Sequence, residues 1–242
     1  MTDNPCNKNG SVEAQIEALN RHCYCISLDR EALSRELERD VSLRGLYGSL
    51  ADSHPHLFSA VPVFVSHHHV VGMAEIIRAI ESVVAMPAYR EQVMQWAPEI
   101  AGFDPGPLGV FLGFDFHLGL DGPKLIEINT NAGGALVNTV LARAQRACCP
   151  SVEAFMVGPV DLPLLEAHFF DMFVKEWRRQ RGDQTLRTLA IVDDAPESQY
   201  LYPEFVLFRQ LFERFGLEAV IVDAKEFSWQ DDGLRYGDVS VD

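Results

Sequence analysis

The sequence has no long apolar run, no surplus of basic residues and no paired cysteine motif. No stretch approaches the roughly 18 uninterrupted apolar residues of a membrane span, and residues 1–10 lack the apolar core of a secretory signal. We therefore expect a cytoplasmic protein with no membrane partner. The five cysteines show neither Cys-x-x-Cys nor zinc-finger spacing, which predicts reduced thiols.

Basic residues are scarce throughout the chain. The 242 residues contain 20 Lys and Arg against 35 Asp and Glu, a formal net charge of −15. This charge repels nucleic-acid phosphates and anionic lipids, so nucleic acid is not an expected partner. The dense basic cluster at 175–181 is short and predicts a solvated helix end.

Hydrophobic periodicity predicts several helices in the first three quarters of the chain. Alternating valines at 61–65 predict a short strand, and the three histidines at 67–69 predict a solvated turn, with a ligand-contacting or pH-sensitive loop as the alternative. Pro87 predicts a break between two helices. The segments with helical spacing are 11–50, 72–95, 135–147 and 164–179.

The last part of the chain is typical of a β-α-β unit with parallel strands. Two apolar runs, 188–194 and 217–223, flank an amphipathic helix at 202–215 that Gly216 ends. The polar stretch 178–185 predicts a boundary between a domain at 1–180 and a second domain that begins at 186. A sheet that stops at Asp242 exposes an edge, which predicts a chain continuing beyond this residue and self-association into a homo-oligomer.

The residues that carry chemistry lie in a predicted hairpin within 107–131. If residues 120–122 form a three-residue loop, cross-strand partners have numbers that sum to 242, so Asp115 faces Glu127. Like charges that face each other in this way are destabilising. Asn129 lies two residues beyond Glu127, hence on the same face of the strand.

Two explanations of this acidic pair remain open. Two carboxylates and an amide oxygen form a hard-oxygen set that suits Mg²⁺, which keeps its other positions for water and substrate phosphates. Acidic residues on a solvated face of a sheet are equally consistent with the spacing.

The sequence KLIEINTNAGGAL at 124–136, preceded by GFDF at 113–116, resembles the Mg²⁺-binding strands of ATP-grasp ligases. It is most similar to the circularly permuted branch that includes eukaryotic-type glutathione synthetase and glutathionylspermidine synthetase-like proteins. In that branch the metal strands precede a Rossmann-like substrate domain, which is the order of parts here. The resemblance implies an α/β (α+β) fold: an ATP-grasp-like half-domain followed by the start of a Rossmann-like domain.

The resemblance also implies a role for particular residues. Asp115, Glu127 and Asn129 would bind Mg²⁺ that bridges the phosphates of ATP. The loop near the substrates and cofactor would contain Asn131, Gly133 and Gly134, and the small-molecule carboxylate or amine substrate would contact Glu197 and Gln199.

Two features depart from the family pattern. Gly113 stands where glutathione synthetase has an arginine that grips a substrate carboxylate, so glutathione is not assigned as the product. The chain also has no Gly-rich GxxxxGK(S/T) loop and no Gly-rich lid around ATP phosphates. In the permuted family those parts follow the substrate domain, so we expect them beyond residue 242 and expect the present chain to be inactive by itself.

Three functional hypotheses follow. The first is an ATP- and Mg²⁺-dependent carboxylate–amine ligase that acts through an acylphosphate and requires no side-chain nucleophile. The second is a non-catalytic binding or accessory module that keeps the fold with an incomplete ATP site. The third is a metal-dependent hydrolase that uses the same acidic hairpin.

Overall fold

The computed structural model describes most of the chain and divides it into two compact units. The first unit comprises residues 1–22 and 63–132, and the second comprises 23–62 and 133–242. Both contain helices and strands, which confirms the predicted mixed α/β class. The boundary predicted at 178–185 lies within the second unit. The described residues are 11–22, 26–38, 54, 56–59, 61–119, 121–147, 162–230 and 233–242.

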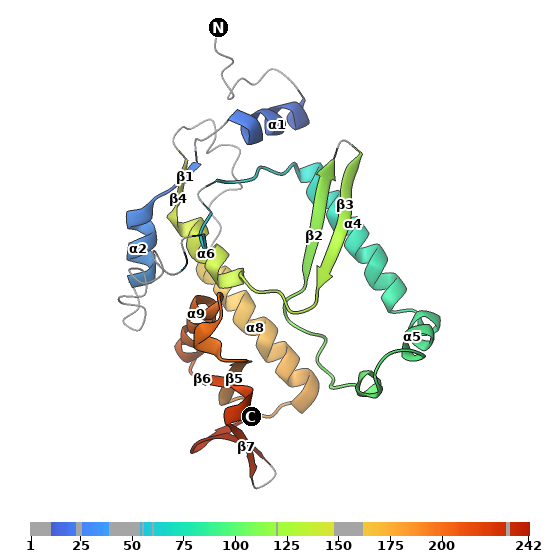
Figure 1. Ribbon diagram of the computed structural model, residues 1–242, viewed down its shortest axis with the longest axis vertical. Helices are drawn as coiled ribbons and strands as arrows, with labels where there is room; N and C mark the ends of the chain where they lie inside the picture. The colour runs from blue at the N-terminus through green and yellow to red at the C-terminus, as the bar shows by residue number, and fades with distance from the viewer. Residues whose placement is uncertain are drawn as a thin grey trace. The chain divides into compact units, whose positions relative to one another are not determined.

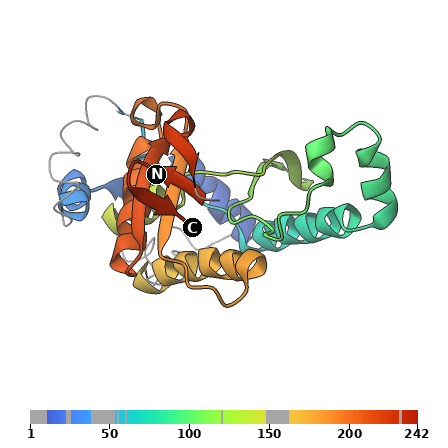
Figure 2. The same ribbon diagram turned by 90° about the horizontal axis from the view of Figure 1, so that it is seen from below.

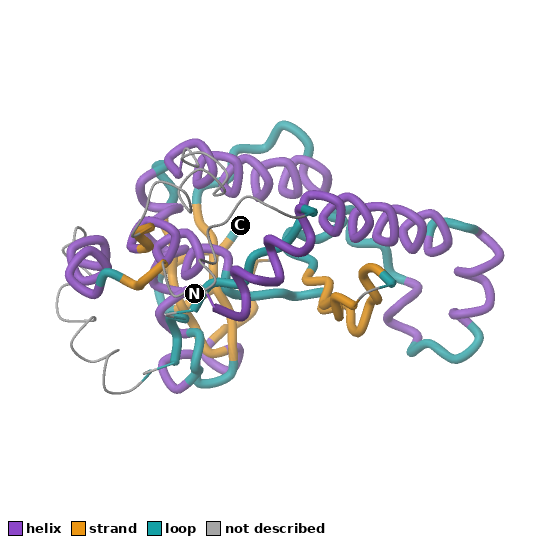
Figure 3. The backbone as a smooth tube through the Cα atoms, turned by 90° about the horizontal axis from the view of Figure 1, so that it is seen from above, coloured by secondary structure: helices purple, strands orange, loops and turns teal. Residues whose placement is uncertain are grey.

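The first unit is a β-hairpin packed along one long helix. Figures 1 and 3 show strands β2 (Gly113–Gly119) and β3 (Gly122–Asn129) beside helix α4 (His67–Val84). A Cβ built on Gly72 of α4 would lie 3.2 Å from the Cγ of Pro123, so helix and strand approach closely there. Other elements of the unit are α1 (Val12–His22), α5 (Pro87–Met94) and a 3₁₀ turn at Glu99–Gly102.

Helices α4 and α5 follow one another with the break that Pro87 predicts. Figure 2 shows α4 turning into α5, and Pro87 occupies the start of α5, where its missing N–H costs nothing. Helix α4 has no buried residue, although Val70, Val83 and Val84 are among its apolar side chains.

The predictions for 61–69 are wrong. Residues 61–65 form no strand; instead the backbone of Phe64 pairs with the side-chain amide of Asn20 through two hydrogen bonds of 2.7 and 2.9 Å. The three histidines form the first turn of α4 rather than a turn before it. Ser66 begins this helix, because its Oγ accepts a hydrogen bond from the His69 amide at 3.1 Å.

The hairpin has the predicted pairing of Asp115 with Glu127, but it reaches that pairing differently. Gly119 pairs with Gly122, so the loop is one residue shorter than the predicted three-residue loop, which is therefore wrong. A β-bulge between the Phe116–Leu125 and Asp115–Glu127 pairs adds Ile126 to β3. The extra residue cancels the shorter loop and restores the register.

The second unit contains the parallel pair predicted for the end of the chain. Strands β5 (Thr188–Asp193) and β6 (Glu218–Asp223) pair in parallel, and helix α9 (Tyr202–Arg214) connects them and packs on β6. Gly216 has φ of 86° just after α9, as its predicted role in ending the helix requires.

Further helices and short strands complete the second unit, and Figure 1 shows α6, α8 and α9 near β5 and β6. The helices are α2 (Arg30–Glu38), α6 (Ala135–Ala144) and α8 (Leu162–Arg181). The short strands form two antiparallel sheets. Strand β1 (Ile26–Leu28) pairs with β4 (Gln145–Ala147), and β7 (Phe227–Gln230), β8 (Gly233–Tyr236) and β9 (Val239–Val241) form a meander.

An apolar cluster and a charge network hold the helices of this unit together. Leu33 and Leu37 of α2 pack with Val140 and Ala144 of α6 and Val206 of α9. Nearby, Glu166 of α8, 8% exposed, accepts hydrogen bonds from Arg143 at 2.8 Å and Arg214 at 3.0 Å.

Candidate functional site

The exposed face of the hairpin carries the two opposed carboxylates. Asp115 and Glu127 are both exposed, while Phe114 and Phe116 on the other face are half-buried. Directly opposed side chains in such a ladder have Cβ atoms about 4.5–5.5 Å apart. The neighbouring Lys124 forms its ion pair with Asp121, at 3.6 Å. Within the described residues, no cationic side chain forms an ion pair with Asp115 or Glu127.

Asn129 completes this face at the end of β3. It lies opposite Gly113, on the same face as Glu127. Its Oδ1 accepts a hydrogen bond from the Asn131 amide at 3.1 Å, so the side chain also shapes the turn that follows. The carboxamide oxygen has a second lone pair that this hydrogen bond leaves available. Asn131 itself is exposed.

Gly113 is crowded by the turn after β3. The Ala132 amide donates to the Phe111 carbonyl at 3.2 Å, and a Cβ on Gly113 would lie 3.1 Å from the Cβ of Ala132. A longer side chain at 113 would therefore require the turn to move. This packing gives a local physical reason for glycine at the position where the glutathione synthetase pattern has arginine.

Across the described residues, no three His, Cys, Asp or Glu side chains are grouped so that they could hold a metal ion. The hairpin offers two carboxylates and one amide oxygen. A Mg²⁺ ion bound there would depend on water or phosphate oxygens for the rest of its coordination shell.

Gly133 and Gly134 lie where helix α6 begins, in the second unit. Gly134 has φ of 99°, a left-handed conformation that glycine adopts without strain. A Cβ on Gly133 would lie 2.6 Å from the Cδ1 of Leu201, so the backbone comes unusually close to this side chain. The Leu136 amide in the first turn donates to the carboxylate of Glu204 at 3.2 Å.

Glu204 is a buried carboxyl group that the sequence analysis did not identify. It extends from α9, is 3% exposed and caps a helix that begins nearly seventy residues earlier in the chain. Burial raises the pKa of Glu204, and hydrogen bonds from the amides of Leu136, Gly134 and Ala135 oppose this effect. Its Oε2 has no hydrogen-bond partner among the described residues. A carboxylate of the protein thus occupies the helix N-terminus that the resemblance assigns to the cofactor loop.

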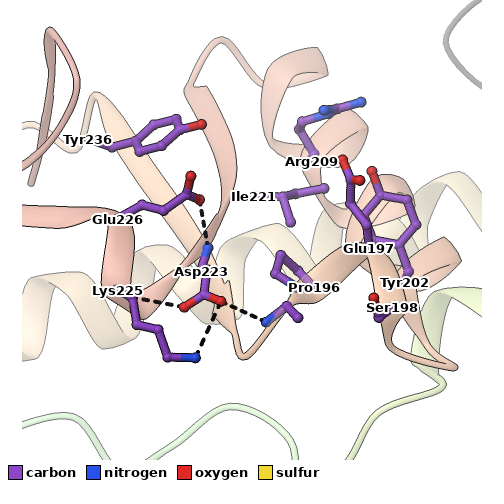
Figure 4. A pocket seen from close by; sticks show the side chains of 11 residues that line it. Pro196, Glu197, Ser198, Tyr202, Arg209, Ile221, Asp223, Lys225, Glu226 and Tyr236 are labelled. Atoms are coloured by element: carbon purple, nitrogen blue, oxygen red, sulfur yellow. Dashed lines mark hydrogen bonds and ion pairs between the residues drawn. The ribbon is translucent and has the colours of Figure 1, made fainter.

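A cavity of about 590 Å³ lies beyond the carboxyl ends of β5 and β6 (Figure 4). Open parallel sheets bind ligands at this edge. Glu197, a predicted substrate contact, lines the cavity. Gln199, the other predicted contact, does not line it and instead donates from Nε2 to the Asp194 carbonyl at 2.6 Å.

Asp223 fixes the shape of this strand-end cavity. Its carboxylate accepts hydrogen bonds from the Lys225 amide at 3.0 Å and the Ala195 amide at 2.9 Å, and these bonds lower its pKa. Ala195 has φ of 43°, an uncommon conformation for a residue with a Cβ. A hydrogen bond to Asp194 at 3.3 Å raises the pKa of Lys225.

Most of the residues around the cavity were not predicted from the sequence. One feature of the sequence did indicate a site here: both parallel strands end in aspartate, and the carboxyl ends of parallel strands meet at one edge of a sheet. Other contributors come from α9, from the 3₁₀ turn Ala224–Glu226 and from the meander, and their distance from one another in the sequence concealed them: Tyr202, Arg209, Glu226 and Tyr236.

No protein-family model matches this chain, and no curated protein or solved structure is detectably similar to it. Among the helices that the structure describes, none combines the length and apolarity needed to cross a membrane.

We predict that Asp115→Asn leaves the metal-free protein as stable or more stable, by about 0.2–1 kcal/mol, because it removes cross-strand repulsion. Urea denaturation in EDTA measures this change, with Asp121→Asn as the control carboxylate on the same hairpin. A clear loss of stability in Asp115→Asn alone would instead assign Asp115 a structural hydrogen bond.

Glu204→Gln should alter how stability depends on pH. The ordinary pKa of a glutamate side chain, 4.5, applies to Glu204 in the unfolded chain, whereas the pKa is higher in the folded protein. Above pH 4.5 the unfolded chain has therefore lost a proton that the folded protein still binds, so the stability of the folded protein falls as pH rises. Glutamine keeps an oxygen that can accept from Leu136 and has no proton to lose. In chemical denaturation, the stability of Glu204→Gln relative to wild type should therefore increase as the pH rises above 4.5. A pH-independent difference would refute this assignment.

Proposed function

We propose that this chain contributes the Mg²⁺–phosphate-binding hairpin of an ATP-dependent carboxylate–amine ligase. The observation that carries the proposal is the pairing of Asp115 with Glu127 on an exposed face, where no cationic side chain of the described residues forms an ion pair with either carboxylate. Asn129 on the same face adds a neutral oxygen donor. This donor set fits Mg²⁺ rather than a softer metal.

Asp115 and Glu127 would hold Mg²⁺, which when bound neutralises charge on the phosphates of ATP. Without the ion, the two carboxylates repel the nucleotide, so the hairpin makes nucleotide binding conditional on the metal. The hydrogen bond between Asn129 and the Asn131 amide would fix the orientation of the amide oxygen beside them.

The proposed reaction needs no nucleophile from the protein. A substrate carboxylate oxygen bonds to the γ-phosphorus of ATP while ADP leaves, and the amine nitrogen of the second substrate then bonds to the acyl carbon while phosphate leaves. Catalysis of this kind rests on positioning and electrostatics.

Nucleotide binding to this chain should require Mg²⁺ and both carboxylates. By isothermal titration calorimetry, MgATP should bind to wild type, and ATP in EDTA should not. Asp115→Asn and Glu127→Gln should each weaken MgATP binding by about tenfold or more, since loss even of outer-shell partners costs about 10–100-fold at metal sites. Asp121→Asn, on the same hairpin, should bind as wild type does. Equal affinity in all four proteins would refute the site.

One observation favours a non-catalytic binding module as the second candidate. The start of α6, where the resemblance assigns cofactor contacts, is capped by the protein's own Glu204. A phosphate at that helix N-terminus would have to displace this buried carboxylate.

Trapping the acylphosphate separates the two candidates. A ligase, assayed as the full-length protein with MgATP, hydroxylamine and a panel of amino acids and short peptides, should form hydroxamates, because hydroxylamine attacks the activated acyl carbon. Asp115→Asn should abolish this product, and Asp121→Asn should retain it. Binding of MgATP without hydroxamate formation would identify the binding module.

A further inference from the structure

The strand-end cavity of the second unit has Arg209 on one wall and Glu226 on the other, and each wall also carries a group of the opposite sign, Glu197 beside Arg209 and Lys225 beside Glu226. Figure 4 shows Glu226 and Tyr236 on one side, and Arg209, Glu197 and Tyr202 on the other. Ile221 lies between them and gives the cavity an apolar surface. The volume of about 590 Å³ is typical of sites for small molecules.

The wall that contains Arg209 has a guanidinium that a ligand can reach. Arg209 is about one-third exposed and contacts Glu213 through Nε at 4.0 Å, a distance too long for a hydrogen bond. A planar guanidinium binds a carboxylate through two parallel hydrogen bonds. Lys225, the other cation of the cavity, is already engaged with Asp194 and Asp223, at 3.3 and 3.7 Å.

The wall that contains Glu226 is held in place by the local fold. One oxygen of Glu226 accepts the Asp223 amide at 3.3 Å as part of a capping box. A carboxylate can accept several hydrogen bonds, so Glu226 retains capacity for an ammonium group. The Tyr236 ring beside it can also contact a cation through its face.

We propose that the strand-end cavity binds a linear zwitterion with a carboxylate at one end, held by Arg209, and an ammonium group at the other, held by Glu226. The apolar middle of the ligand would lie over Ile221 between the rings of Tyr202 and Tyr236. Calling this ligand a substrate rests on the proposed ligase function, whereas its binding does not.

The spacing of the two charges can be tested with compounds of similar size. The probe is 6-aminohexanoate, which has its charges at opposite ends. Hexylamine and hexanoate each lack one charge, and 2-aminohexanoate is an isomer with adjacent charges. Titrations of the 242-residue chain followed by NMR should give at least tenfold weaker binding for each of these three compounds than for 6-aminohexanoate.

Two variants locate the ends of the ligand. Arg209→Gln should weaken the binding of 6-aminohexanoate and hexanoate and leave the binding of hexylamine unchanged. Glu226→Gln should weaken the binding of 6-aminohexanoate and hexylamine and leave the binding of hexanoate unchanged. Arg187→Gln and Glu218→Gln, at the opposite end of the parallel strands, are the matched controls and should bind as wild type does.

The outcomes separate this proposal from the ligase proposal. All titrations are made without Mg²⁺ or ATP, so Asp115→Asn should bind 6-aminohexanoate normally even if the hairpin site is wrong. The proposal is overturned if 6-aminohexanoate shows no saturable binding, if 2-aminohexanoate binds equally well, or if only one of the two cavity variants has an effect.

Discussion

Two carboxylates lie directly opposite each other on neighbouring strands of one hairpin, and their mutual repulsion destabilises the metal-free strand pair. Ile126 sets up this arrangement: as the extra residue of a bulge, it places Glu127 opposite Asp115 and is itself 67% exposed. Bulges recur next to active sites, where they redirect side chains. The candidate metal site therefore depends on one irregularity in β3.

A second carboxyl group has a different relation to its surroundings. Glu204 is buried and joins α9 to the first turn of α6 across a long stretch of sequence. Asp115 and Glu127 stay in contact with water, where repulsion is moderate and a cation can reach them. Glu204 is removed from water, so its charge is costly and its function is to hold the backbone of Gly134–Leu136. Exposure thus separates the candidate ligand-binding carboxylates from a carboxylate with a structural role.

Local patterns predicted much of this fold, and long-range contacts account for the failures. Helical periodicity, Pro87 and Gly216 fixed the boundaries of several elements because each acts through the backbone near it. The strand expected at 61–65 does not form, because the backbone of Phe64 pairs with the side chain of Asn20, which is distant in the sequence. The Asp115–Glu127 pairing was predicted from a loop length that was one residue too long, and an unpredicted bulge compensated. Arg209, Glu226 and Tyr236 come together only in the folded unit, so spacing in the sequence could not identify them.

Paramagnetic relaxation by Mn²⁺, which replaces Mg²⁺ at oxygen sites, tests the central claim most directly. With a net charge of −15, the protein has many exposed carboxylates that could attract the ion weakly. In the presence of ATP, substoichiometric Mn²⁺ should first broaden the amide resonances of residues 113–117 and 125–131, and Asp115→Asn should remove this effect. Broadening spread over the acidic surface, or centred elsewhere and unchanged in Asp115→Asn, would contradict a metal site on the hairpin.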